Sequence, residues 1–254
     1  MQQAFQGQVP RFDNIGVDYV LSVSEGVTNY IKDTFGFPEE KIYRVPDFID
    51  PNIFNTEFGM ETIDEIVENP NDDTDLTIEP VERPKEKKNI IAFMPRKGVE
   101  IQYGQFFALA QGQGLLAEWE IVPIINKTKK EVAEILKDAK VFVNFTTGEG
   151  FGLPALESLL CGCVFVGNSG LGGLEFLDDT TNAVINIPDI YNPYDWVTAI
   201  KSAIGFSKLP SSYAADLSKK LAEKYSYDNF TKAIKMSVKA IQDQPNTKEV
   251  VPEK

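Results

Sequence analysis

Short apolar runs alternate with helical patterns along the chain from residue 89 to residue 205. The runs have the length of buried strands, and apolar residues recur at helical spacing between them. They cover residues 89–94, 119–125, 141–145, 163–166 and 184–187. This alternation predicts an α/β fold: a Rossmann-like parallel sheet with helices on both faces and a ligand site at the carboxyl ends of the strands. Arg96, Asn126 and Glu149 each follow a predicted strand, so we expect them at that edge.

The loop that follows the predicted strand at 141–145 is suited to an anion. Gly148, Gly150 and Gly152 leave its backbone uncovered, and Pro154 fits the first turn of the helix that comes next. The unpaired N–H groups at the start of a helix favour a negative group. We therefore expect this loop to accept a phosphate.

Two carboxylates flank the loop. Glu149 lies within it, and Glu157 follows after seven intervening residues, one turn into the predicted helix. At this helical position Glu157 borders the buried stripe and can face a groove. A simpler alternative is that both glutamates only complement the helix dipole. A dipole, however, requires neither three glycines nor two carboxylates.

The net charge of the chain limits the classes of partner that it can bind. Its 25 basic and 38 acidic residues give a net charge of −13, which argues against a nucleic acid or an anionic membrane as a general partner. Histidine is absent, which removes Ser-His-Asp and Cys-His catalysis and the usual zinc sites. Cys161 and Cys163 give no disulfide framework, and no signal peptide or membrane-spanning run is evident. We therefore expect a cytoplasmic protein without a transmembrane segment.

Residues 1–55 carry a smaller α/β pattern. A short strand is expected at 19–23, a helix that begins at Ser24 and ends at Gly36, and a second strand at 41–45. This pattern predicts the terminal elements of a separate α/β domain.

The remaining segments have different characters. Residues 56–88 are rich in acidic and poor in apolar side chains, so we expect an exposed, mobile insertion or linker. Within the sheet domain at 89–205, residues 168–173 are expected to form a tight glycine-rich loop. Residues 206–243 predict two amphipathic helices, and residues 244–254 a disordered tail.

The residues GEGFGLPALES at 148–158, followed by CGCVFVGNSGLGGLEF at 161–176, resemble a known donor-site signature. It is that of the retaining, GT-B-fold glycosyltransferases of family four, in which two glutamates separated by seven residues flank a loop that meets the donor. Residues 18–50 also resemble the last elements of the acceptor-side domain in that family. The resemblance implies a nucleotide-sugar donor-binding domain at 89–205, preceded by part of an acceptor-side domain.

The resemblance also implies roles for the matched residues. Glu149 is the catalytic candidate, beside the donor sugar, and Glu157 holds the ribose hydroxyls. Arg96 and Lys97 are candidates to grip the diphosphate, although one of them could instead pair with the acidic insertion. The other donor-binding candidates are Ile125, Asn126, Thr147, Gly148, Gly150, Phe151, Gly152 and Leu153. An ordinary strand-to-helix turn would also account for the first two of these.

The implied activity is transfer of a sugar from a nucleotide-sugar, such as a UDP- or GDP-sugar, to an acceptor hydroxyl. We also expect the transfer to retain the configuration of the sugar and to need neither a metal nor a cofactor. The resemblance does not specify the acceptor. Only residues 1–55 precede the linker, so the acceptor domain is expected to be incomplete. Three explanations stay open: a fragment, a short chain completed by a partner or a second copy, and a non-catalytic nucleotide-sugar-binding module. A GT-B-fold epimerase is a more distant alternative.

Overall fold

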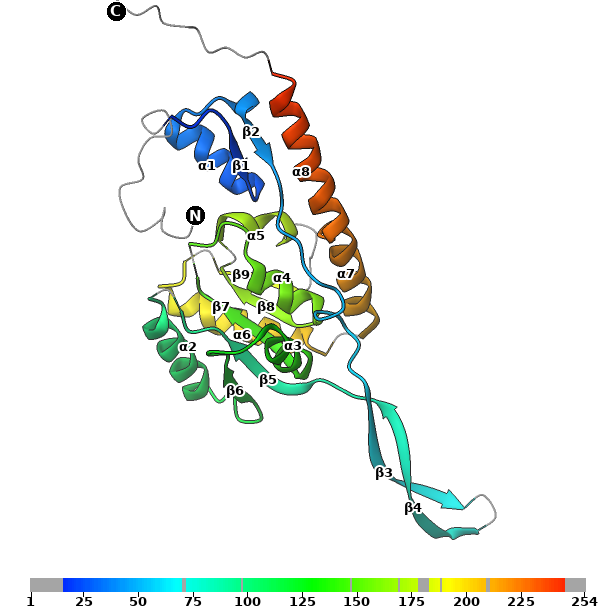
Figure 1. The fold of residues 1–254 in the computed structure, drawn as a ribbon. Coiled ribbons are helices and arrows are strands. Elements are labelled where there is room, and N and C mark those ends of the chain that lie inside the picture. Colours follow the sequence, from blue (N-terminus) through cyan, green and yellow to red (C-terminus); the bar gives the residue numbers. More distant parts are fainter. Residues whose placement is uncertain are drawn as a thin grey trace, which may run out of the picture.

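The strands form three separate sheets among the residues that the computed structural model describes (Figure 1). One is a two-stranded parallel sheet near the N-terminus, one an antiparallel hairpin, and one a five-stranded sheet. The described residues are 16–69, 72–96, 98–146, 148–168, 170–177, 183–187, 189–208 and 211–244.

The five-stranded sheet is parallel throughout, which confirms the fold predicted from the alternating pattern. Its strands are β5 (Lys88–Phe93), β6 (Glu120–Pro123), β7 (Ala139–Asn144), β8 (Val164–Gly167) and β9 (Val184–Asn186). Their order in the sheet is β6-β5-β7-β8-β9. The sheet therefore begins at Lys88, one residue before the predicted boundary.

The strand order changes direction between β5 and β7. From β5 the chain passes to β6 on one side, and it then returns past β5 to β7, β8 and β9 on the other side. In open parallel sheets a ligand binds at the carboxyl ends of the strands where the order reverses. The loops after β5 and β7 therefore frame the position at which a ligand is expected.

Helices cover both faces of this sheet. The helices α2 (Glu100–Gly112) and α6 (Pro193–Phe206) pack on one face, and α3 (Lys129–Asp138), α4 (Leu153–Leu160) and α7 (Ser211–Lys224) pack on the other. Strand β7 shows the consequence for sequence. Its Val141 and Val143 pack in the core beneath α2 and α6, whereas Phe142 packs in the core beneath α3, α4 and α7. All three side chains are fully buried. A strand buried on both faces reads as a continuous apolar run, which is the signal that predicted it.

The N-terminal unit consists of β1 (Val20–Ser22), α1 (Glu25–Phe35), a 3-10 turn (Glu39–Lys41) and β2 (Ile42–Arg44). Strands β1 and β2 pair in parallel. Both predicted ends of α1 are confirmed: the Ser24 hydroxyl accepts a hydrogen bond from Val27 N, and Gly36 closes the helix with a left-handed φ of 62°. These local capping signals explain why the helix could be placed from sequence.

Helix α8 (Tyr227–Gln242) runs from α7 to the N-terminal unit (Figure 1). It meets the segment after β2 through aromatic rings, with the Phe48 ring centroid 5.0 Å from that of Tyr227 and 5.0 Å from that of Phe230. No helix in the described ranges, α8 included, is long and apolar enough to cross a membrane.

The acidic segment forms a regular hairpin that the sequence did not lead us to expect. Strands β3 (Met60–Asn69) and β4 (Asp72–Pro84) pair antiparallel, with an irregularity at Glu68 and Asn69. Figure 1 shows the hairpin extending away from the five-stranded sheet. The low apolar content argued against a core, and what joins β3 to β4 is the backbone ladder of the pair. Of the predicted tail at 244–254, residues 245–254 lie outside the described residues.

The expectation of a glycine-rich loop at 168–173 was wrong, because residues from Gly170 form the helix α5 (Gly170–Leu177). The glycines are needed here for close packing. A Cβ added to Gly172 would lie 2.1 Å from Gly150 O and 2.4 Å from Phe151 Cα, which is far inside van der Waals contact. The helix therefore packs directly on the backbone of the loop before α4.

Candidate functional site

The loops after β5 and β7 bring Arg96 and Glu149 into contact. Arg96 Nη2 donates a hydrogen bond to Glu149 Oε1 at 2.5 Å. Glu149 is 8% exposed, whereas the side chain of Arg96 is 36% exposed. Charge-assisted pairs of this kind are strong when water is partly excluded. Two residues that the sequence predicted from separate strands thus meet at the switch point of the sheet.

Arg96 has further capacity to bind. Its Nε is buried and has no hydrogen-bond partner within the described part of the chain. A buried donor left without a partner costs about 1–3 kcal/mol. Because a guanidinium carries five donors in a planar fork, it can hold a second anion beside the Glu149 carboxylate. An anionic ligand can approach the guanidinium through its exposed part, since the Arg96 side chain is 36% exposed.

The start of α4 has no capping side chain. Gly152 is the N-cap residue with a left-handed φ of 92°, and Pro154 lies in the first turn. Gly148 is exposed, and a Cβ added to it would have no atom within 4 Å. Backbone N–H groups at an uncapped helix N-terminus attract negative charge. Pro154 has no N–H and Ala155 N donates to Gly152 O, so the amides available to an anion are those of Leu153 and of the loop before it, and binding of an anion there stays a prediction.

Apolar side chains anchor the same loop. The Phe151 ring is 3% exposed and makes edge contacts with Phe176 at 5.8 Å and Tyr225 at 5.3 Å between centroids. Leu153 is partly buried against the same core. These two predicted positions therefore hold the loop through their side chains and leave only their backbone for a ligand.

Glu157 is partly buried on α4, and this burial raises the pKa of its carboxyl to about 7. The charge of Glu149 raises the pKa further, whereas Lys129 and Arg96 oppose the rise. Arg96, Glu149 and Glu157 therefore lie within electrostatic reach of one another. No hydrogen bond or ion pair to the Glu157 carboxylate is found within the described ranges, so its oxygens can accept hydrogen bonds from a ligand.

Lys129 was missed by the sequence analysis. It is the first residue of α3, where its charge acts on Glu157. A lysine at a helix N-terminus opposes the helix dipole, and that unfavourable placement is the signal that could have identified it. Next to it, Thr128 and Glu131 form a capping box, since each side chain accepts a hydrogen bond from the other residue's backbone N–H.

Ile125 and Asn126 lie after β6, at the same edge of the sheet as Arg96 and Glu149. Ile125 is 53% exposed, and Asn126 has a positive φ of 53°. Among the described residues, no hydrogen bond or ion pair joins either of them to the Arg96–Glu149 pair. Lys97 and Thr147, the two other predicted donor ligands, lie outside the described residues.

The fold is similar to that of solved GT-B glycosyltransferases. HepE from Anabaena, solved in complex with UDP, aligns with a TM-score of 0.62 at 11% identity over 94% of this chain and 68% of HepE. A glycosyltransferase from Rickettsia africae gives a TM-score of 0.58 at 10% identity over 96% of this chain and 67% of that protein. TarM gives 0.55 at 13% identity over 91% of this chain and 44% of TarM.

Similarity in sequence is confined to a shorter region. No family model matches the chain. A protein described as an alpha-1,6-glucosyltransferase of Actinobacillus pleuropneumoniae serotype 7 is 28% identical over 107 residues, which cover 40% of this chain and 31% of that protein. The chain thus spans less than a third of this relative and less than half of TarM.

Proposed function

We propose that the chain binds a nucleotide-sugar and transfers its sugar to an acceptor hydroxyl. The observation that carries this proposal is the contact between Arg96 and Glu149 at the switch point of a GT-B sheet, beside the uncapped N-terminus of α4. The glucosyltransferase relative supports a sugar as the transferred group. HepE and pneumococcal GtfA were both solved with UDP, so UDP is the first nucleotide to test and GDP the second.

The proposed roles follow from the charge that develops as the bond between sugar and diphosphate breaks. Arg96 and the amides of the loop before α4 stabilise the departing diphosphate. Glu149 lies beside the sugar and stabilises its positive charge. Glu157 accepts hydrogen bonds from the ribose hydroxyls. The remaining proposed donor ligands are Lys97, Ile125, Asn126, Thr147, Gly148, Gly150, Phe151, Gly152 and Leu153.

Donor binding has a direct thermal test. A ligand that binds only the folded state stabilises it by about 2.7 kcal/mol at 100 times its Kd. For a chain of this length, that corresponds to a rise in melting temperature of several degrees. We expect UDP or GDP to give such a rise when each is compared with ADP and with inorganic phosphate. The absence of a rise with all three nucleotides would contradict donor binding.

A second measurement separates transfer from binding alone. The donor nucleotide-sugar is incubated with a panel of hydroxyl acceptors, and released UDP or GDP is measured. Release with or without acceptor supports a transferase, since slow hydrolysis uses the same donor chemistry. Binding without release would favour the non-catalytic nucleotide-sugar-binding module. Activity that appears only with a second chain or at high protein concentration would favour an acceptor side completed in trans.

The proposal includes retention of configuration and the absence of a metal and of any cofactor. We expect NMR of the product to show the same anomer as the donor, and we expect EDTA to leave the rate unchanged. An inverted anomer, or a loss of activity in EDTA that Mg²⁺ or Mn²⁺ restores, would contradict these parts. We place the protein in the cytoplasm, in agreement with two buried free thiols at Cys161 and Cys163.

A further inference from the structure

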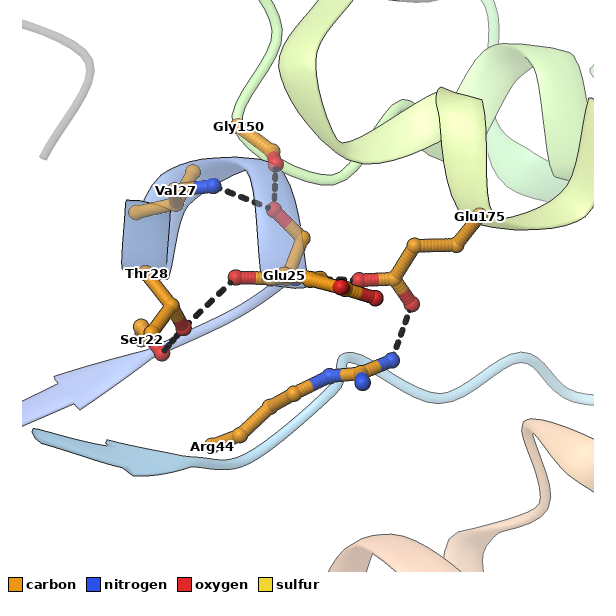
Figure 2. Close-up of polar contacts among 8 residues, drawn as sticks. Ser22, Glu25, Val27, Thr28, Arg44, Gly150 and Glu175 are labelled. Atoms are coloured by element: carbon orange, nitrogen blue, oxygen red, sulfur yellow. Dashed lines mark hydrogen bonds and ion pairs between the residues drawn. The ribbon is translucent and has the colours of Figure 1, made fainter. Parts of the chain in front are cut away.

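The N-terminal unit reaches the donor loop through the residue that caps α1. Ser24 is fully buried, and its hydroxyl accepts a hydrogen bond from Val27 N at 3.1 Å. The same hydroxyl donates a hydrogen bond to Gly150 O at 2.7 Å, across 126 positions of sequence. Figure 2 shows both bonds converging on this one oxygen. A single serine therefore completes α1 and contacts the donor loop.

A second contact holds α1 against α5. One oxygen of the Glu175 carboxylate on α5 accepts from the backbone N–H of Glu25, and the other pairs with Arg44 Nη2 (Figure 2). The Glu175 side chain is 6% exposed and that of Arg44 is 40% exposed. The helices also approach closely, since a Cβ added to Gly26 would lie 2.2 Å from Leu171 O. Glu175 thus joins both helices and β2.

These contacts fix two peptide planes of the loop. Leu171 N donates to Glu149 O at 3.0 Å, and the Ser24 hydroxyl donates to Gly150 O. In a planar trans peptide the C=O of one residue and the N–H of the next point in opposite directions. With both carbonyls held by α1 and α5, the N–H groups of Gly150 and Phe151 are turned away from these helices. They are two of the amides proposed to meet the donor.

We propose that Ser24 is a positioning residue for the donor site and that Glu175, through Glu25 and Arg44, keeps α1 in place for this purpose. The inference rests on the proposed function, because it assigns these amides to the donor. It makes the N-terminal unit part of the donor site through its contacts with the loop before α4. Ser24 acts through the Gly150 carbonyl, and Glu175 acts through α1.

The test compares Ser24→Ala with Ser226→Ala in the full chain. Ser226 caps α8 by accepting from Asn229 N, so both variants lose an N-cap and both should lower the melting temperature. The fall should be larger for Ser24→Ala, because only this variant also removes the bond to Gly150 O. We expect Ser24→Ala to weaken UDP affinity by up to about tenfold, because the nucleotide must then order the loop that the lost bond held. Ser24→Thr keeps the hydroxyl and should restore most of the affinity.

The second measurement needs no nucleotide. Backbone NMR relaxation of the unliganded protein should show lower order parameters at Gly150 and Phe151 in Ser24→Ala and unchanged values there in Ser226→Ala. If wild type binds no nucleotide, the donor assignment fails, and the order parameters still decide whether Ser24 orders the loop. Equal order parameters at these amides in wild type and both variants would overturn the inference.

Glu175→Gln provides a variant that keeps Ser24. It retains an oxygen for the Glu25 amide but loses the charge that pairs with Arg44. Its matched control is Glu39→Gln, which breaks the exposed Lys32–Glu39 ion pair elsewhere on the same unit. We expect a lower order parameter at Phe151 and weaker UDP binding for Glu175→Gln alone. The same behaviour in both variants would overturn the role of Glu175.

Discussion

The substitution Glu157→Gln is expected to stabilise the unliganded protein at pH 8 by up to about 3 kcal/mol and to change its stability little at pH 4. Burial raises the pKa of Glu157 from near 4.5 to about 7 in the folded state. Between these values the folded protein keeps a proton that the unfolded chain has lost. The free energy of unfolding therefore falls as the pH rises through this window, by about 1.4 kcal/mol per pH unit, and levels off above pH 7. Glutamine carries no charge and avoids this loss.

Urea denaturation at pH 4, 6 and 8 measures this effect. The matched control is Glu134→Gln on α3, where the side chain is exposed and the change should have little effect at any pH. The same variants should differ in nucleotide binding: Glu157→Gln is expected to weaken UDP affinity at least about tenfold, because a carboxylate can accept from both ribose hydroxyls and an amide oxygen cannot do so as strongly. A more stable variant with unchanged UDP affinity would contradict the ribose role.

The substitution Glu149→Gln is expected to lower the rate of sugar transfer about 100-fold while UDP affinity changes only slightly. Removing one group that stabilises developing charge in a transition state costs about 10²–10³ in kcat. Glutamine still offers an oxygen to Arg96 Nη2, so the loop geometry should persist. Initial rates over a range of donor concentrations, together with calorimetry for UDP, separate the effect on kcat from the effect on binding.

Arg96→Ala is the contrasting variant for this experiment. It removes the proposed diphosphate ligand and one partner of a carboxylate that is 8% exposed. We expect UDP affinity to fall about 10- to 100-fold, since hydrogen bonds between charged groups contribute about 1.5–3 kcal/mol. If Glu149→Gln and Arg96→Ala lose UDP affinity equally, Glu149 serves to hold Arg96 and has no separate role at the sugar.

The structural features that the sequence predicted correctly depend on local interactions. Ser24 and Gly36 marked the ends of α1 because each acts within one turn of its own position. The buried strands were also evident, since both of their faces meet helices. Because Arg96 and Glu149 each follow a predicted strand, the rule for parallel sheets placed them at the ligand edge.

The features that the sequence analysis missed depend on contacts between distant segments. The bond from Ser24 to Gly150 and the pairing of Glu175 with Arg44 have no pattern within either segment. Helix α5 was mistaken for a loop because its glycines serve a close approach, which the sequence alone does not distinguish from a turn. The β3–β4 hairpin was missed because an acidic composition indicates that a segment is exposed, but it does not indicate whether the segment forms paired strands.

The two ends of the β3–β4 hairpin lie next to each other, since Met60 and Pro84 are partners in its register. The chain therefore enters and leaves the hairpin at nearly the same place, whatever the length of the hairpin. The spacing between the N-terminal unit and the five-stranded sheet is consequently independent of the length of the hairpin. An affinity tag or a reporter domain inserted between residues 69 and 72 would be carried outward without stretching the junction that joins the two parts.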